Sequence, residues 1–242
     1  MKEALIVGGS NGIGLSIVTQ LKGYDVIHIV DKVEPAIALP SHIKYKQFDL
    51  TMPDYSFFDQ FGNISLLMIT AGFGKLALFE ELSEDYIINS FHVNTVSAIR
   101  LIHHFYDKLK GQEDFFCGVM VSIAGFMSSP FFSVYGATKA ALKIFIESVN
   151  VELEMAGSPN RILNVSPGSI PGTRFNGSDN DLSLTQELAQ EIISHLEAKD
   201  DLFIPKYEEV YREVLARYQK DFRAEGRHSY EYKLKSGRLN RK

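Results

Sequence analysis

A glycine-rich turn joins an apolar stretch to a stretch with helical spacing at the start of the chain. Residues 3–7 read EALIV, the turn contains Gly8, Gly12 and Gly14, and apolar residues recur at helical spacing over 15–21. This order is the context of a phosphate-binding loop, because Gly8 permits a tight turn, Gly12 admits a pyrophosphate and Gly14 lets helix and strand pack closely. A plain turn is the alternative. The loop residues expected to bind a dinucleotide are Gly8, Ser10, Asn11, Gly12, Ile13 and Gly14.

Acidic residues end the next two predicted strands. Asp31 ends the apolar run DVIHIV, and Asp49 with Leu50 follows a strand predicted over 42–48. A carboxylate at Asp31 can accept hydrogen bonds from both adenosine ribose hydroxyls and repels a 2′-phosphate, which favours NAD over NADP. A solvated acid is the alternative, and the neighbouring Lys32 keeps NADP open. Asp49 is placed to reach an adenine amino group.

Strand and helix signals alternate along the chain. We predict helices over 83–109 and 135–155. Further strands are predicted over 65–69, 118–121, 161–165 and 201–205. This alternation predicts an α/β, doubly wound Rossmann fold with a central parallel sheet of about seven strands flanked by helices on both faces. We expect a single domain over 1–225, followed by a basic C-terminal tail over 226–242 that is either solvated or packed on its own domain or a second subunit.

Three side chains in the second half of the chain suggest a reaction. Ser122 follows an apolar run, so its hydroxyl is expected at the carboxyl edge of the sheet. Tyr135 and Lys139 are four residues apart in an alanine-rich segment, which places phenol and ammonium on one helix face. An ammonium nearby is expected to lower the phenol pKa. Tyr135 can then protonate a carbonyl oxygen as a hydride arrives, while Ser122 holds the developing alkoxide.

Plain structural explanations exist for parts of this pattern. Tyr106 and Lys110 have the same spacing, so a Tyr and Lys pair can also be an ordinary helix surface pair. Asn94 lies within an apolar helical stripe, where an amide either bonds to the backbone or orders water for a proton path. Ala71 and Gly72 follow a predicted strand and are small enough for a dinucleotide to lie against the backbone. No spacing among the seven histidines and one cysteine indicates a metal site.

Composition limits the class of protein. The chain has 242 residues, is 45% hydrophobic and carries a formal net charge of −5, which argues against nucleic acid as the main partner. No apolar run approaches membrane-spanning length, and the first residues lack the features of a secretory signal. The single Cys117 cannot form an internal disulfide and is expected in the core. We therefore expect a cytoplasmic protein with neither a nucleic-acid nor a membrane partner.

Taken in order, the glycine loop, Asp31, Asn94, Ser122, Tyr135 and Lys139 resemble the motifs of the short-chain dehydrogenase/reductase family over about residues 1 to 210. The resemblance implies that Tyr135 is the catalytic acid or base and that Lys139 lowers its pKa and holds the nicotinamide ribose. It also implies that Ser122 binds the carbonyl oxygen and that Asn94 positions a relay water.

The same resemblance extends the cofactor site beyond the glycine loop. Pro167 and Gly168 look like the family's segment beside the nicotinamide, with Ile170 in the same segment, and the loop that follows looks like the substrate lid. With Tyr135 and Lys139, these residues complete the expected cofactor contacts.

Three departures from the family pattern affect what can be carried over. Val7 stands where a Thr is usual and Thr70 where an Asn is usual, so the central strands must be braced differently. The usual C-terminal strand ending in Val-Asp-Gly-Gly is absent. We therefore expect a homodimer through the helices at 83–109 and 135–155, with a tetramer left open.

The expected activity is hydride transfer between NAD, or less readily NADP, and a secondary alcohol or its ketone. A small apolar carbonyl or alcohol substrate is favoured by the expected pocket walls, which are Phe73, Phe126, Met127, Phe131, Phe132 and Phe175. Arg174 is either a partner for a substrate carboxylate or solvated. Two rivals stay open: a non-catalytic dinucleotide-binding sensor or scaffold, and a sugar-nucleotide epimerase or dehydratase, which the GxxxGxG spacing disfavours.

Overall fold

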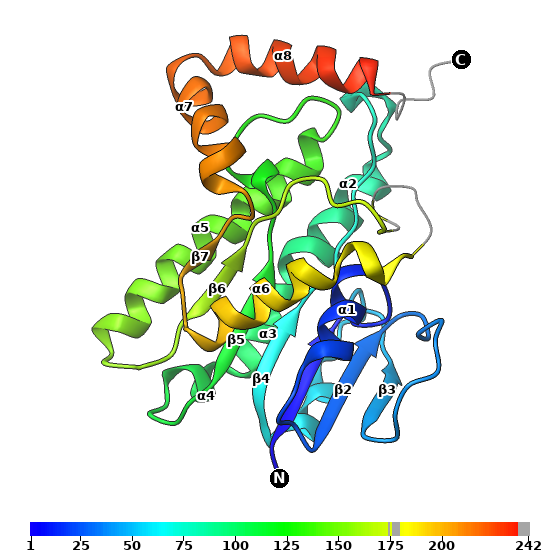
Figure 1. Ribbon diagram of the computed structural model, residues 1–242, viewed down its shortest axis with the longest axis vertical. Helices are drawn as coiled ribbons and strands as arrows, with labels where there is room; N and C mark the ends of the chain where they lie inside the picture. The colour runs from blue at the N-terminus through cyan, green and yellow to red at the C-terminus, as the bar shows by residue number, and fades with distance from the viewer. Residues whose placement is uncertain (174, 176–179, 237–242) are drawn as a thin grey trace.

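Seven parallel strands form one sheet in the order β3-β2-β1-β4-β5-β6-β7 (Figure 1). The computed structural model describes residues 1–173, 175 and 180–236. The strands are β1 (Glu3–Val7), β2 (Val26–Asp31), β3 (Ile43–Gln47), β4 (Ile64–Ile69), β5 (Phe116–Met120), β6 (Ile162–Val165) and β7 (Leu202–Phe203). The strand order reverses at β1, which pairs with β2 on one side and β4 on the other. Open sheets of this kind bind ligands at such a reversal, outside the carboxyl ends of the strands.

Helices cover both faces of the sheet, as predicted. They include α1 (Gly12–Gln20), η1 (Ser56–Phe61), α5 (Ser133–Met155) and α6 (Gln186–Glu197). Leu5 and Val7 contribute to a core with η1 and α5, whereas Ala4 and Ile6 contribute to a core with α1 and α6. Because β1 is buried on both faces, it reads in the sequence as a continuous apolar run. Cys117 is buried in β5, as expected, and burial raises the pKa of its thiol to about 12.

The helix predicted over 83–109 is interrupted twice. It consists of α2 (Glu84–Phe91), a π-helical turn η3 (His92–Val96), α3 (Ser97–His104) and α4 (Tyr106–Lys110). Ser83 begins the helix as an N-cap, and its hydroxyl accepts a hydrogen bond from Tyr86 N at 3.2 Å. The π-helical turn has about one residue more per turn than an α-helix, and the spacing of apolar residues gave no sign of it. The prediction of one continuous helix over 83–109 was therefore wrong. The π turn contains Asn94, and such turns occur frequently at functional sites.

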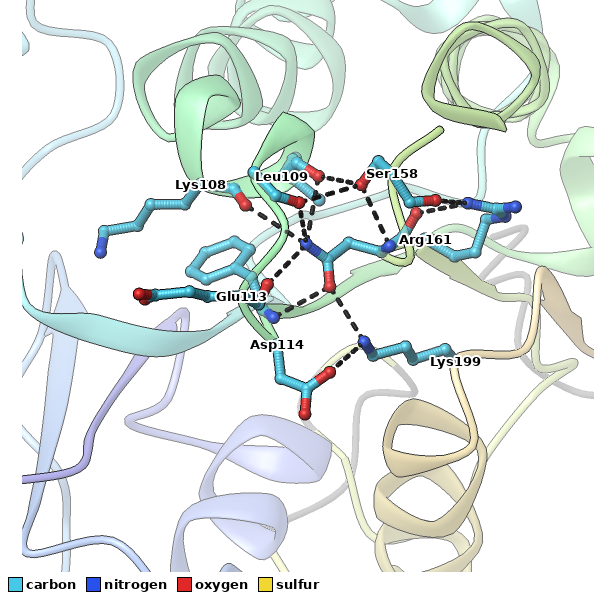
Figure 2. A network of polar contacts seen from close by, with 10 residues as sticks. Lys108, Leu109, Glu113, Asp114, Ser158, Arg161 and Lys199 are labelled. Atoms are coloured by element: carbon cyan, nitrogen blue, oxygen red, sulfur yellow. Dashed lines mark hydrogen bonds and ion pairs between the residues drawn. The ribbon is translucent and has the colours of Figure 1, made fainter. Parts of the chain in front are cut away.

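A buried amide joins the segments at the amino ends of β5 and β6 (Figure 2). Asn160 Oδ1 accepts hydrogen bonds from Phe115 N and Lys199 Nζ, both at 3.0 Å. Its Nδ2 donates to Glu113 O at 2.9 Å and faces three further carbonyl oxygens. Lys199 in turn pairs with Asp114 at 2.5 Å. Every polar atom of this fully buried side chain is satisfied, which is the pattern of a structural residue.

The C-terminal part of the chain folds into helices beyond the carboxyl ends of the strands, at the top of Figure 1. They are η7 (Tyr207–Tyr211), α7 (Arg212–Lys220) and α8 (Phe222–Lys235). Asp221 caps α8 by accepting hydrogen bonds from Arg223 N at 3.0 Å and Ala224 N at 2.9 Å. The basic stretch up to residue 235 therefore forms a capped helix, while the predicted tail residues 237–242 lie outside the described part of the chain.

Across the described residues, every helix falls short of the length and apolar character needed to cross a bilayer.

Candidate active site

A cavity of about 1000 Å³ opens along the carboxyl ends of the strands. It lies at the strand-order reversal, with the glycine loop at one end and α7 and α8 at the other. Sixteen of the predicted site residues line it: Gly8, Asn11, Gly12, Ile13, Gly14, Asp31, Asp49, Leu50, Ala71, Gly72, Ser122, Tyr135, Lys139, Pro167, Gly168 and Ile170. Ser10 and Asn94, also predicted as site residues, are buried behind its walls.

The glycine loop packs closely against the central strands. Gly8 has a φ of +88°, and a Cβ atom there would lie 2.4 Å from Ala71 N. A Cβ atom on Gly14 would lie 2.4 Å from both Gly8 O and Thr70 Oγ1. A larger residue at either position therefore has no room, which is the close approach of helix and strand expected for Gly14.

Val7 and Thr70 differ from the residues that are usual in the family at the ends of the two central strands. Thr70 makes hydrogen bonds that join these strand ends. Its hydroxyl lies 2.9 Å from Gly8 O and 3.1 Å from Val7 O, both of which can accept its proton. Its backbone N–H also donates to Val7 O at 2.8 Å. A single threonine thus links the end of β4 to the glycine loop.

Buried polar groups at the start of α1 fit a bound phosphate group. Ser10 Oγ and Asn11 Oδ1 are buried and have no hydrogen-bond partner among the residues that the structure describes. Gly12 N donates to Asn180 Oδ1 at 2.7 Å, which shows that this N–H is directed toward an acceptor. A buried polar group without a partner is costly, so the Ser10 hydroxyl, which can donate, fits an anion at the positive end of the helix. Asn11 Oδ1 can only accept, so it fits a donor such as a hydroxyl group of the cofactor. The residues present therefore suit the pyrophosphate of a dinucleotide.

The carboxylate of Asp31 is held by the backbone at the end of β2. Its Oδ2 accepts from Ser10 N at 3.1 Å and its Oδ1 accepts from Lys32 N at 2.7 Å. The side chain of Lys32 turns away and pairs with Asp49 at 3.1 Å. Hydrogen bonds from Thr51 hold the pKa of the Asp49 carboxyl below its usual value. Lys32 is therefore engaged by an acid other than Asp31.

Ser122, Tyr135 and Lys139 come together on one wall of the cavity. Ser122 follows β5, and its Oγ accepts from Ala124 N at 3.1 Å. Tyr135 and Lys139 lie in the first turns of α5 and are 9% and 2% exposed. Lys139 Nζ donates to Met120 O at 2.7 Å and lies 5.7 Å from the centroid of the Tyr135 ring. The end of β5 and the start of α5 thus place hydroxyl, phenol and amine beside one another.

The electrostatics of this wall differ from the expectation. Burial raises the pKa of Tyr135 to about 12, against a smaller lowering by the Ser122 side chain. Burial also lowers the pKa of Lys139 to about 7. The expected lowering of the Tyr135 pKa by Lys139 was therefore wrong for the protein alone, because loss of solvation outweighs a cation that is itself partly neutral near pH 7.

Asn94 is an interior residue whose amide is bonded to its neighbours. Its Oδ1 accepts from Phe73 N at 2.9 Å, and its Nδ2 donates to Phe73 O at 2.8 Å and Thr138 Oγ1 at 3.1 Å. Thr138 Oγ1 donates in turn to Tyr135 O at 2.7 Å. The sequence left two explanations for Asn94 open, an interior amide bonded to the backbone or an amide that orders water. In the structure Asn94 is an interior amide, and its side chain connects η3 to α5, the helix that carries Tyr135.

The aromatic walls were predicted in part. Phe73, Met127, Phe132 and Phe175 line the cavity. Phe126 and Phe131 do not, so that part of the prediction was wrong: Phe126 lies under Lys143 Nζ at 5.0 Å, and Phe131 stacks on Tyr230 at 4.5 Å. Arg174 lies outside the described residues.

The sequence did not predict that the C-terminal helices close one end of the cavity. Nine of its lining residues come from them, and Ser236, which follows α8, is a tenth: Val210, Tyr211, Val214, Arg217, Glu225, His228, Ser229, Tyr232, Lys233 and Ser236. The available signal was an apolar stripe at helical spacing from Tyr207 to Phe222. α8 itself is polar around most of its surface, so its spacing gave no indication of a buried side.

The sequence has recognisable relatives. The human 17-beta-hydroxysteroid dehydrogenase type 1 is 32% identical over 106 residues, which cover 44% of this chain and 32% of that protein. The chain thus spans about a third of the length of this relative. Retinol dehydrogenase 8 of Bos taurus is 28% identical over 231 residues, which cover 88% of this chain and 73% of that protein.

The fold also has solved counterparts. A short chain dehydrogenase/reductase from Burkholderia phymatum, crystallised in complex with NAD, has a TM-score of 0.79 at 17% identity and covers 92% of this chain and 94% of that one. The family model for short chain dehydrogenases matches residues 2–182, about three quarters of the chain. The chain belongs to the short chain dehydrogenase family.

Proposed function

We propose that this protein is an NAD-preferring oxidoreductase that transfers a hydride between the nicotinamide and a secondary alcohol or its ketone. The observation that carries the proposal is the meeting of Ser122, Tyr135 and Lys139 on the wall of a cavity that also contains the glycine loop. The names of the human and bovine relatives, a hydroxysteroid dehydrogenase and a retinol dehydrogenase, support hydride chemistry on an alcohol or ketone.

The chain's own residues would handle the proton and the substrate oxygen. A bound nicotinamide supplies or accepts the hydride. In reduction, the Tyr135 hydroxyl gives its proton to the carbonyl oxygen, and the Ser122 hydroxyl donates a hydrogen bond to the same oxygen. Burial raises the Tyr135 pKa to about 12, so the phenol holds its proton at neutral pH and is ready to act as an acid.

Lys139 and Asn94 would act around the phenol. When protonated, Lys139 favours the phenolate that remains after proton transfer, and its Nζ lies on the cavity wall where a nicotinamide ribose can meet it. Asn94 would hold Phe73 and α5 in place through its three hydrogen bonds. Its expected role in positioning a relay water remains part of the proposal.

NAD is the preferred cofactor in this proposal. Asp31 lines the cavity at the end of β2, where its carboxylate would accept hydrogen bonds from the ribose hydroxyls and repel a 2′-phosphate. Lys32, the residue that could favour NADP, is paired with Asp49. Asp49 and Leu50 would lie beside the adenine, and Pro167, Gly168 and Ile170 beside the nicotinamide.

The test is oxidation of NADH and of NADPH with a panel of ketones, diketones and keto acids. Turnover with NADH in preference to NADPH supports the proposal, and NADH binding without turnover of any carbonyl supports the sensor or scaffold alternative. The panel includes a sugar nucleotide, because epimerisation without net change in NADH would indicate the epimerase alternative.

We also propose that the protein is a cytoplasmic homodimer formed through the helices at 83–109 and 135–155. Ile144 and Val151 on α5 are 58% and 59% exposed, and Ile88 on α2 is 50% exposed, which leaves apolar side chains on the outer faces of these helices. Replacing Ile144 and Val151 with glutamate should convert a dimer to a monomer in light scattering. A monomeric parent protein would contradict the dimer.

A further inference from the structure

Lys233 on α8 is a cation at the substrate end of the cavity. Its Nζ donates hydrogen bonds to Ser129 Oγ at 2.7 Å and Pro130 O at 2.8 Å, and lies 5.4 Å from the centroid of the Phe132 ring. Burial lowers its pKa to about 8, and no carboxylate of the described chain contributes to that shift. Among the described residues, the ammonium therefore contacts dipoles and an aromatic ring rather than a carboxylate.

The other cations that line the cavity are already engaged. Arg217 pairs with the buried Glu225 at 2.8 Å, Lys32 pairs with Asp49, and Lys139 is bonded to the Met120 carbonyl. Among the described residues Lys233 thus differs from Arg217 and Lys32 in having no carboxylate partner, and from Lys139 in its place on α8 rather than beside Tyr135. A half-buried ammonium loses part of its hydration, which destabilises its charged form. An anion bound beside it would offset that loss.

Hydroxyl groups on the same wall can complete an anion site. Ser128 and Ser129 both line the cavity below α8. Ser128 Oγ is buried without a hydrogen-bond partner in the described part of the chain, and Ser129 Oγ receives its hydrogen bond from Lys233. An ammonium with one N–H left and a buried hydroxyl without an acceptor are the groups that bind a carboxylate.

The position of Lys233 relates this site to the reaction. The Phe132 ring contacts both the Lys233 ammonium and the Tyr135 ring, whose centroid lies 5.4 Å from its own. The anion site is thus separated from the proposed proton donor by one aromatic side chain. Phe73, Met127 and Phe175 also line the cavity, and Phe175 packs against both Phe132 and Tyr135.

We propose that the substrate is an apolar ketone or secondary alcohol that carries a carboxylate, and that Lys233, with Ser128 and Ser129, binds this carboxylate. The proposal rests on the proposed function for the position of the reacting carbon. It adds the chemical class of the substrate and a specificity-determining residue contributed by α8.

The test compares binding of decanoate with that of its neutral analogue decanamide by isothermal titration calorimetry. In the parent protein decanoate should bind at least about tenfold more tightly, the difference expected for a charge-assisted hydrogen bond. Lys233→Met should remove that preference while changing decanamide affinity less than about threefold. Lys235→Met, on the exposed side of the same helix, is the matched control and should leave both affinities unchanged.

Lys233→Arg keeps the charge and should keep a preference for decanoate. This variant is the control that distinguishes loss of the charge from loss of folding in Lys233→Met. Equal affinities for the two ligands in the parent protein would overturn the proposal. So would parallel losses for both ligands in Lys233→Met, since these would make Lys233 a latch between α8 and the 128–132 loop. Because the titration needs no turnover, its outcome is independent of whether the protein reduces ketones.

Discussion

The Nζ atom of Lys139 donates a hydrogen bond to the carbonyl oxygen of Met120 at 2.7 Å. This contact fixes the amine at the end of β5, one helical turn from Tyr135 and in a place that water barely reaches. Burial there lowers the Lys139 pKa to about 7 from its ordinary 10.5.

Lys139→Met should therefore make the protein more stable near neutral pH. Between about pH 7 and pH 10 the unfolded chain binds a proton at Lys139 that the folded protein lacks, so the stability of the parent protein rises with pH in this range. The methionine variant lacks this dependence. Its advantage in melting temperature should be largest at pH 6 to 7 and shrink toward pH 10. A constant difference across this range would contradict the lowered pKa.

Asp31 has two separable roles, and two substitutions distinguish them. Asp31→Asn keeps an oxygen that can accept from Ser10 N but removes the charge, whereas Asp31→Ala removes both. If charge sets the cofactor preference, both variants should lower the ratio of NADH to NADPH efficiency by about tenfold or more. The loop-bracing role predicts a lower melting temperature for Asp31→Ala alone. A parent enzyme that uses both cofactors equally would overturn the role of Asp31 in selection.

Thr70 should contribute to stability through its hydroxyl. Thr70→Val keeps the shape of the side chain but leaves Gly8 O and Val7 O without this donor. The expected loss is about 1 to 2 kcal/mol in the free energy of unfolding, measured with urea. Thr70→Ser retains the hydroxyl and should recover most of that loss. Equal stabilities for Thr70→Val and the parent protein would show that the strands are braced elsewhere.

The hydrogen bonds of the Asn160 side chain, at the amino ends of the strands, should stabilise the fold without affecting the cavity. Asn160→Leu leaves Phe115 N and several carbonyl oxygens buried without a hydrogen-bond partner. The expected loss is therefore about 2 to 4 kcal/mol in the free energy of unfolding. The network lies at the opposite end of the sheet from the cavity, so NADH affinity of the folded variant should stay within about twofold. A large fall in NADH affinity with unchanged stability would contradict this assignment.

Much of the fold could be predicted because its signals are local. Strands buried on both faces, such as β1, appear as unbroken apolar runs, and Gly8 and Gly14 are required by close approaches that admit no Cβ atom. The positions of Ser122, Tyr135 and Lys139 followed from a strand end and one helical turn.

The remaining features depend on contacts between distant segments. The direction of the Tyr135 pKa shift depends on burial beneath elements far away in sequence, whereas the sequence indicated a nearby lysine alone. Asn94, in the π turn, bonds to Phe73 and Thr138, which lie on other segments. Lys233 belongs to a polar helix that lies over the cavity, where Tyr230 stacks on Phe131. None of these contacts leaves a periodic signal in the sequence.

In the proposed nicotinamide-dependent reaction, Tyr135 transfers the proton to the substrate oxygen. The most direct measurement is ketone-dependent NADH oxidation by the parent protein and by Tyr135→Phe, with NADH binding to both followed by fluorescence. We expect kcat to fall about a hundredfold or more and the NADH Kd to change less than about threefold, because phenylalanine keeps the ring and loses the acidic proton. A Tyr135→Phe variant that reduces ketones at the parent rate would contradict this role of Tyr135.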